Sequence, residues 1–266
     1  WAAGDFTNRL AGQAYGINDY GTISQPKLSV AVTPVKGLTA YANYGRTFQL
    51  GVGAGAYKVP PRAADLDPSI NDGWEAGLRY SPSRRIEARI ALWQQTASGE
   101  IKRRLNDPAG DFDNLGKTRR RGIDLQLDAR PASWVSLWGA YSYQYARILR
   151  PDPANPAQAG NRIDHVPQNV FSGGVDIKPD NRWRLSLTGN GQSSYELTPA
   201  NTQRRYGDHF VLNAEASFAV TPELEVSAQV KNLTNDKYEY VWFDGVQVLH
   251  SPADSRAFYA AARVRL

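Results

Sequence analysis

Apolar and polar residues alternate along most of the chain. In residues 224–231, Leu, Val, Ala and Val hold one set of alternate positions, and Glu, Ser, Gln and Lys hold the other. A period of two is typical of a β-strand with one apolar and one polar face. The alternation recurs at 74–81, 86–93, 123–129, 135–144, 171–177, 183–189, 210–218 and 258–266, and no apolar-face position in these segments is charged. The pattern therefore predicts an all-β chain.

Two architectures share this alternation: a soluble β-sandwich and a transmembrane antiparallel β-barrel. The predicted strands run to about 10 to 13 residues, longer than the usual strand of about 5 to 6 and long enough to cross a bilayer at a tilt. Aromatic residues lie near strand ends, among them Trp74, Tyr80, Trp183, Phe210 and Phe258. Aromatic girdles at two membrane interfaces would look like this. The pattern favours the barrel, and the sandwich is the alternative.

The connections alternate between short and long. Turns rich in Pro, Gly and Asx are predicted at 34–37, 82–85, 131–133, 179–181 and 221–223, with long polar loops at 49–73, 97–116, 148–167, 196–208 and 233–256. Short turns at one end and long loops at the other are the layout of bacterial outer-membrane barrels. Counting back from Leu266 gives eleven strands to residues 28–32, and a weaker candidate at 8–19 makes about twelve.

Composition removes several classes of function. The 266 residues include no Cys and no Met, which excludes disulfides, thiolate metal sites and a cysteine nucleophile. No run of about 18 apolar residues could form a membrane helix. The chain starts at Trp1 within a pattern, so we expect a fragment of a longer protein. His165, His209 and His250 match no metal-ligand spacing, and no catalytic constellation is found, so we expect no enzyme and no metal site.

Four motifs point to one family. Residues 232–239 (NLTNDKYE) and the last predicted strand, 255–266, resemble the end of TonB-dependent receptors. Residues 74–80 (WEAGLRY) and 114–125 (NLGKTRRRGIDL) are similar to two earlier strands of that family, so the resemblance covers about 27–266. It implies an outer-membrane β-barrel, with 1–266 as the C-terminal part of the barrel domain, about half of a 22-stranded barrel, and no plug domain. The chain ends in Leu266, where the family most often has Phe.

The resemblance also implies a function and partners. It implies active import of a ferric siderophore or similar scarce chelate, energised by the TonB complex through the N-terminal region that this sequence lacks. We expect no cofactor, since the iron chelate would be the ligand. Outer-membrane lipid and lipopolysaccharide are the other expected partners, and nucleic acid is not. The alternatives are a passive porin-type channel and an outer-membrane structural or hydrolase barrel.

Clustered arginines and aromatic residues in the long loops are the candidate ligand contacts. The family resemblance implies a vestibule in which guanidinium groups grip the anionic edges of a chelate. The candidates are Tyr57, Arg103, Arg104, Arg119, Arg120, Arg204, Arg205, Tyr206, Trp242 and Phe243. The competing interpretation is that these arginines meet lipopolysaccharide phosphates or water. We expect strand alternation to end at the membrane surface, so the pattern does not assign each arginine to a side of the barrel.

Overall fold

A computed structural model of the chain describes residues 4–8, 12–17, 21–50, 67–103, 112–153, 155–244 and 246–265. The regular structure in these ranges is β-strand, apart from a single 3-10 turn, η1 (Pro156–Gln158). Within them, no helix is both long enough and apolar enough to cross a membrane.

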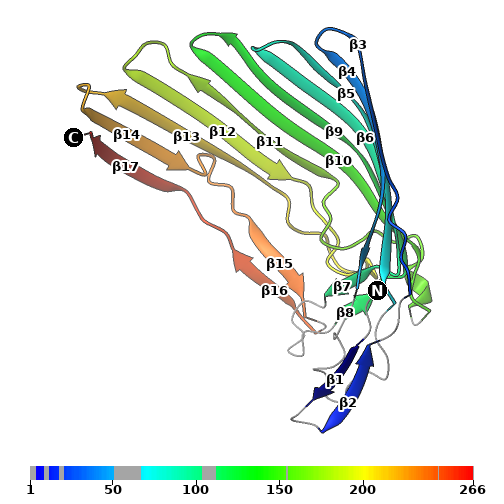
Figure 1. The fold of residues 1–266 in the computed structure, drawn as a ribbon. Coiled ribbons are helices and arrows are strands. Elements are labelled where there is room, and N and C mark those ends of the chain that lie inside the picture. Colours follow the sequence, from blue (N-terminus) through cyan, green and yellow to red (C-terminus); the bar gives the residue numbers. More distant parts are fainter. Residues whose placement is uncertain are drawn as a thin grey trace.

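Eleven antiparallel strands form one curved sheet (Figure 1). In spatial order they are β17 (Ala257–Val264), β14 (Leu224–Lys231), β13 (His209–Ala219), β12 (Trp183–Gln192), β11 (Asn169–Ile177), β10 (Val135–Arg150), β9 (Lys117–Ala132), β6 (Ile86–Ser98), β5 (Ser69–Ser83), β4 (Leu38–Gln49) and β3 (Lys27–Val35). Each strand of this sheet pairs with the sheet strand that precedes or follows it in sequence. The all-β prediction and the eleven sheet strands are confirmed.

The short turns lie along one end of the sheet, the upper edge in Figure 1. Their sequences explain them. Gly37 has a φ of 84°, and a Cβ there would lie 2.8 Å from Pro82 Cα in the adjacent turn, so only glycine fits. At the last two turns, the Asp180 carboxylate accepts N–H groups from Arg182 and Trp183, and the Thr221 hydroxyl oxygen accepts those of Glu223 and Leu224.

The opposite end carries the long connections, and these hold structure that the pattern did not predict. Two hairpins form inside them, β7 (Ile101–Arg103) with β8 (Phe112–Asn114), and β15 (Glu239–Phe243) with β16 (Val248–Pro252). The segment at 8–19 is not a twelfth sheet strand. It contributes instead to a separate hairpin of β1 (Gly4–Asn8) and β2 (Gln13–Ile17), since Gly12, at a φ of 64°, turns the chain back on itself.

Within the part of the chain that the structure describes, no segment packs against the apolar face of the sheet. Leu28 is 63% exposed, Leu92 is 49% exposed and Phe258 is 71% exposed, and the same holds along every sheet strand. Two layers of a soluble sandwich would bury these side chains. The buried apolar residues within the described ranges instead cluster mainly at the long-loop end. The apolar face is therefore a surface for hydrocarbon, and the sandwich alternative is wrong.

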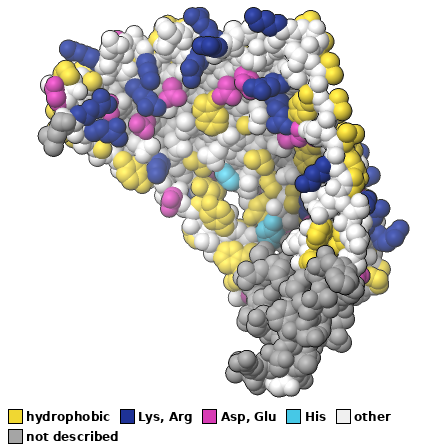
Figure 2. Space-filling model, in the orientation of Figure 1, with side chains coloured by type: hydrophobic (Ala, Val, Ile, Leu, Met, Phe, Trp, Pro, Cys, Tyr) yellow, Lys and Arg dark blue, Asp and Glu magenta, His cyan; other side chains and the backbone are white. Residues whose placement is uncertain are grey.

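The other face is polar. In its middle, Arg89 donates to the Tyr41 hydroxyl at 2.7 Å and to a Glu75 carboxylate oxygen at 2.5 Å. Figure 2 shows Lys, Arg, Asp and Glu side chains spread over the face of the strands turned toward the viewer. Such a wall suits the water-filled or plugged interior of a large barrel.

Among the described residues the sheet is open, because β3 and β17 each have a neighbouring strand on one side only. In an antiparallel sheet each step reverses the chain direction, so the two edges of an eleven-stranded sheet run the same way. Pairing them would create a parallel contact, which a closed antiparallel barrel does not contain. Unpaired backbone groups in hydrocarbon cost several kcal/mol each. Both edges consequently require further antiparallel strands, odd in number.

Candidate functional site

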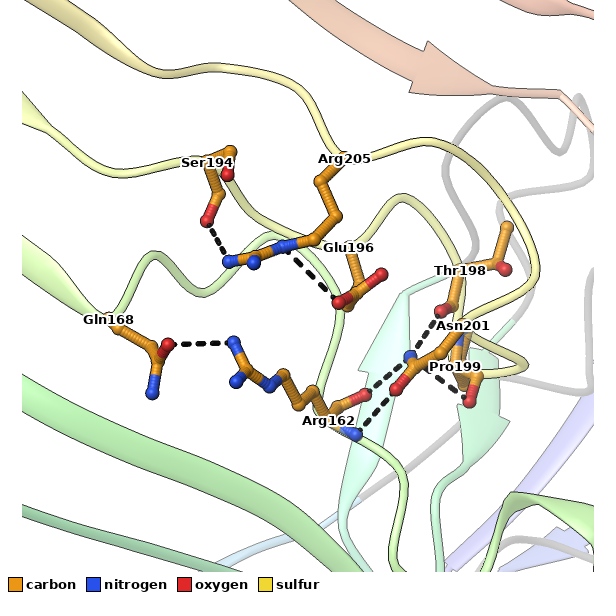
Figure 3. Close-up of polar contacts among 8 residues, drawn as sticks. All are labelled: Arg162, Gln168, Ser194, Glu196, Thr198, Pro199, Asn201 and Arg205. Carbon is orange, nitrogen blue, oxygen red and sulfur yellow. Dashed lines mark hydrogen bonds and ion pairs between the residues drawn. The ribbon is translucent and has the colours of Figure 1, made fainter.

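Two long loops, following β10 and β12, are locked together by backbone and amide hydrogen bonds (Figure 3). Asn201 is at the centre, in a left-handed conformation with a φ of 55°. Its side-chain oxygen accepts the N–H of Arg162 at 2.7 Å, and its amide donates to the carbonyls of Arg162 and Thr198, both at 2.9 Å. Asn161 donates back to the carbonyl of Pro199 at 2.9 Å. The two asparagines thus provide partners for backbone groups of both loops.

Small apolar cores support these loops from either side. Leu115, Ala146, Ile148 and Ile163 form one buried cluster, which ties the first loop to β10 and to the residues just before β9. A second cluster of Tyr195, Leu197 and Val241 connects the second loop to the β15–β16 hairpin, with Tyr206, Phe243 and Val248 packed around it. Burial raises the pKa of the Tyr195 phenol. The segments 155–168, 193–208 and 239–252 therefore form one packed body, which we call the loop platform.

Charged side chains on the platform are mostly paired. Arg205 lies 3.3 Å from a carboxylate oxygen of Glu196 and donates to the Ser194 carbonyl at 2.8 Å. Arg162 donates to the Gln168 side chain at 2.7 Å. Figure 3 shows these two arginines extended along neighbouring loops. The Arg205 charge is thus compensated inside the protein, which reduces its attraction for an external anion.

Arg204 differs from Arg205 in having no carboxylate partner within the described ranges. It is exposed, and its guanidinium lies over the ring of Tyr206 at 5.5 Å from the centroid, a cation–π contact. The same tyrosine meets the ring of His250 edge-on at 5.5 Å. Arg204 and Tyr206 together present a cation and a flat surface at the edge of the platform.

Trp242 and Phe243, both in β15, are partly buried. Phe243 packs on the Tyr195 cluster, so its main contacts are internal. The Trp242 indole N–H is buried and has no hydrogen-bond partner within the described ranges. Buried polar groups nearly always have a partner, so this unpaired N–H is an exception.

The arginine run 119–121 is divided between the two faces of β9. Strand alternation continues to Lys117, so Arg120 shares the polar face with Asp124, whereas Arg119 and Arg121 share the apolar face with Ile123. Arg120 donates to Glu100 at 2.6 Å and is thereby neutralised. Our expectation that alternation ends at the membrane surface was wrong for this strand. Arg119 therefore lies away from the loop platform, on the opposite side of the wall.

The remaining candidates add little to this geometry. Arg103 lies in β7, whose backbone alone is described, and Tyr57 and Arg104 lie outside the described residues. Sequence reasoning missed Asn161, Asn201 and Glu196, which organise the platform. Asn201, which follows Pro199 and Ala200, was a turn signal, but its partner in the other loop, Arg162, lies 39 positions away in sequence. No group of three or more His, Asp or Glu side chains in the described part of the chain is arranged to hold a metal ion.

Comparison with known proteins settles the family. The family model described as "TonB dependent receptor-like, beta-barrel" matches residues 2–233, most of the chain. This chain belongs to the TonB-dependent receptor family. TonB-dependent receptors are transport receptors rather than enzymes, and their barrels lie in the bacterial outer membrane. The long loops of this chain are accordingly extracellular, and its short turns face the periplasm.

Two curated relatives and two solved structures define the similarity. The chain is 23% identical to the ferrioxamine B receptor of Salmonella typhimurium over 76% of its own length, and 23% identical to the ferrichrome outer membrane transporter/phage receptor of Escherichia coli K12 over 90%. It spans only 28% and 31% of those proteins. The unliganded ferric citrate transporter FecA superposes with a TM-score of 0.76 at 22% identity. The match covers 97% of this chain and 40% of the FecA chain. For the ferric yersiniabactin uptake receptor FyuA of Yersinia pestis, the TM-score is 0.75 at 18% identity. The match covers 95% of this chain and 39% of the FyuA chain.

Proposed function

We propose that this chain is the C-terminal part of the barrel of an outer-membrane receptor that imports a ferric siderophore or a similar iron chelate, energised through TonB. The curated relatives support the ligand class, because they are named for ferrioxamine B and ferrichrome. The observation that carries the proposal is the loop platform, a packed extracellular body that holds Arg204 and Tyr206 in place.

The chemistry of the platform suits an anionic or strongly polar chelate. Among the candidate arginines whose side chains are described, Arg120 and Arg205 face carboxylates, and Arg119 lies on the outward face. Arg204 is left as the exposed platform cation, with no carboxylate partner within the described ranges. A guanidinium beside an aromatic ring recognises a planar, oxygen-rich anion by paired hydrogen bonds and stacking. We assign Arg204 and Tyr206 as primary ligand contacts, and the accessible part of the Trp242 ring as a secondary one.

The partners follow from the same proposal. The TonB complex would act through an N-terminal region outside this sequence, and the barrel strands would contribute no chemistry. The outward apolar face would contact outer-membrane lipid and lipopolysaccharide. A passive porin-type channel is the competing function, since it would use the same wall without an energy source.

Uptake of 55Fe-labelled chelates by cells that carry the full-length receptor as their sole iron receptor tests the proposal. We expect uptake of at least one chelate to require the receptor and to stop when a protonophore collapses the proton gradient. Uptake that survives the protonophore would establish a passive channel and overturn the proposal.

Binding to the purified receptor tests the residue assignment separately. R204Q should weaken binding of that chelate by about tenfold, since it removes one charge-assisted contact. R182Q is the matched control, because it removes the same charge from a periplasmic turn. Equal affinity in both variants would remove Arg204 from the site.

A further inference from the structure

Cations gather at the short-turn end of the sheet, which faces the periplasm. The turns between sheet strands carry Lys36, Arg84, Arg85, Lys178 and Arg182, all of them exposed. Figure 2 shows Lys and Arg side chains along the upper edge, where these turns lie. Within the described ranges, none of these five side chains forms an ion pair with a carboxylate. This end of the protein therefore attracts anionic groups from the periplasm.

Arg84, Arg85 and Arg130 form a cluster at one point of this edge. The Arg130 N–H donates to the Arg85 carbonyl at 2.6 Å, so these two residues lie side by side on neighbouring strands. The Ser83 hydroxyl oxygen accepts the Arg85 N–H at 3.2 Å, which fixes the turn that holds Arg84. Like charges side by side on antiparallel strands destabilise the pairing. An external carboxylate bound between the guanidinium groups would remove this repulsion.

The three arginines line a groove with a volume of about 420 Å³. Its lining also includes Asp128, Ser136 and Trp138. Asp128 and Trp138 are paired in the register of β9 and β10, and both lie on the polar face of the sheet. Trp138 is 39% exposed, so the groove has an aromatic wall on which a ligand can pack. Because the polar face is turned away from hydrocarbon, lipid head groups do not reach this groove.

The carboxylates of the groove differ in how they are paired. Asp128 lies directly opposite Glu87 in the register of β6 and β9, so two acidic residues face each other. Glu87 is held by Arg79 at 2.8 Å, and Asp176 lies 3.4 Å from Arg184. Asp128 has no ion-pair partner in the part of the chain that the structure describes. The groove thus offers three guanidinium groups and one uncompensated carboxylate, and a complementary ligand carries anionic groups with a cationic group beside them.

We propose that this groove binds the peptide stems of peptidoglycan, the polymer of the periplasm, and so tethers the barrel to the cell wall. A stem carries several carboxylates and, on its diamino acid, an ammonium group. Guanidinium groups bind carboxylates through paired hydrogen bonds, so the three arginines hold the stem carboxylates, and Asp128 holds the ammonium group. The adjoining sugar packs on Trp138. A purely anionic ligand would leave Asp128 uncompensated. The proposal rests on the outer-membrane location and is independent of chelate import.

The experiment measures binding of muropeptides, the soluble fragments that a muramidase releases from peptidoglycan, to the purified full-length receptor. Isothermal titration would compare the wild type, R84Q/R85Q/R130Q and the control R182Q/R263Q/R265Q, which loses three arginines from the same end of the sheet but outside the groove. We expect about tenfold weaker binding in the first variant and the wild-type affinity in the control. No binding to the wild type, equal affinity in all three proteins, or an equal loss in both variants would overturn the proposal.

Different ligands on the wild-type protein test the same claim if the triple variant does not fold. The receptor would be titrated with muropeptides, with muropeptides whose amino group is acetylated, with glycan chains stripped of their stems and with a polyglutamate peptide. The proposal predicts the tightest binding for intact muropeptides, and D128N should abolish the difference between the free and the acetylated form. Equal binding of the stem-free glycan, or tighter binding of polyglutamate, would contradict it.

Discussion

The eleven-stranded sheet, which we call the wall, and the loop platform are stabilised in opposite ways, although one chain forms both. The wall has no core of its own, and side chains such as Leu125 and Phe258 are exposed on it. Its stability comes from ladder hydrogen bonds and from the surrounding hydrocarbon. The platform lies in water and stabilises itself as a soluble domain does, with buried clusters around Ile148 and Val241 and with side-chain partners for its backbone. The two regions should therefore respond differently to the same kind of substitution.

The largest effect is expected in the wall, from a charge placed on its outward face. Leu125 lies at the middle of β9 and faces lipid, so L125R should destabilise the folded barrel by about 2–4 kcal/mol. The neighbouring Q126R faces the interior and is the control. Urea unfolding of the full-length receptor in lipid vesicles would measure both. Comparable losses in the two variants would show that the faces are not distinct.

An intermediate effect is expected in the platform. N201A removes the acceptor of the Arg162 N–H and the donors to two carbonyls, which should cost about 1–3 kcal/mol and loosen only the loops. Hydrogen exchange should rise in 155–168 and 195–208 and stay unchanged in β9 and β10. T202A, an exposed neighbour, is the matched control. Faster exchange throughout the strands would mean that the platform and the wall are one cooperative unit.

The smallest effect is expected at the tip of the β15–β16 hairpin. There the Asp244 carboxylate accepts the N–H groups of Gln247 and Val246, each at 2.8 Å, and these bonds lower the pKa of Asp244 below its ordinary value of 3.8. Because the folded pKa is lowered, this stabilisation is full above pH 3.8 and is lost as the pH falls through the lowered value. Amide exchange at Gln247 should therefore stay slow to below pH 4 in the wild type. It should already be faster at pH 7 in D244A, and identical exchange in the two proteins would contradict this.

Sequence reasoning was effective for the wall and much less so for the platform. Alternation located the eleven sheet strands and the short turns, because a lipid-facing strand must show an apolar side chain at every second position. The platform depends on contacts between distant loops, as between Asn161 and Pro199, which no local pattern encodes. The hairpin at 4–17 was missed because a strand signal does not distinguish one strand from two short ones.

The side of each arginine in the run 119–121 was predictable from the sequence after all. Ile123 faces lipid, and counting back by twos assigns Arg121 and Arg119 to the same face. The prediction assumed that the alternation ends at the membrane surface, whereas β9 continues to Lys117. The ligand roles of Arg120, Arg204, Arg205, Tyr206, Trp242 and Phe243 remain predictions.

Labelling of single cysteines along β9 tests most directly the claim that one face meets lipid and the other the barrel interior. This chain contains no native cysteine, so residues 123–128 can be replaced one at a time in the full-length receptor. In intact outer membranes, a lipid-soluble maleimide should label positions 123, 125 and 127, and a charged, water-soluble maleimide should prefer 124, 126 and 128. Equal labelling at all six positions, or the reverse alternation, would contradict the account.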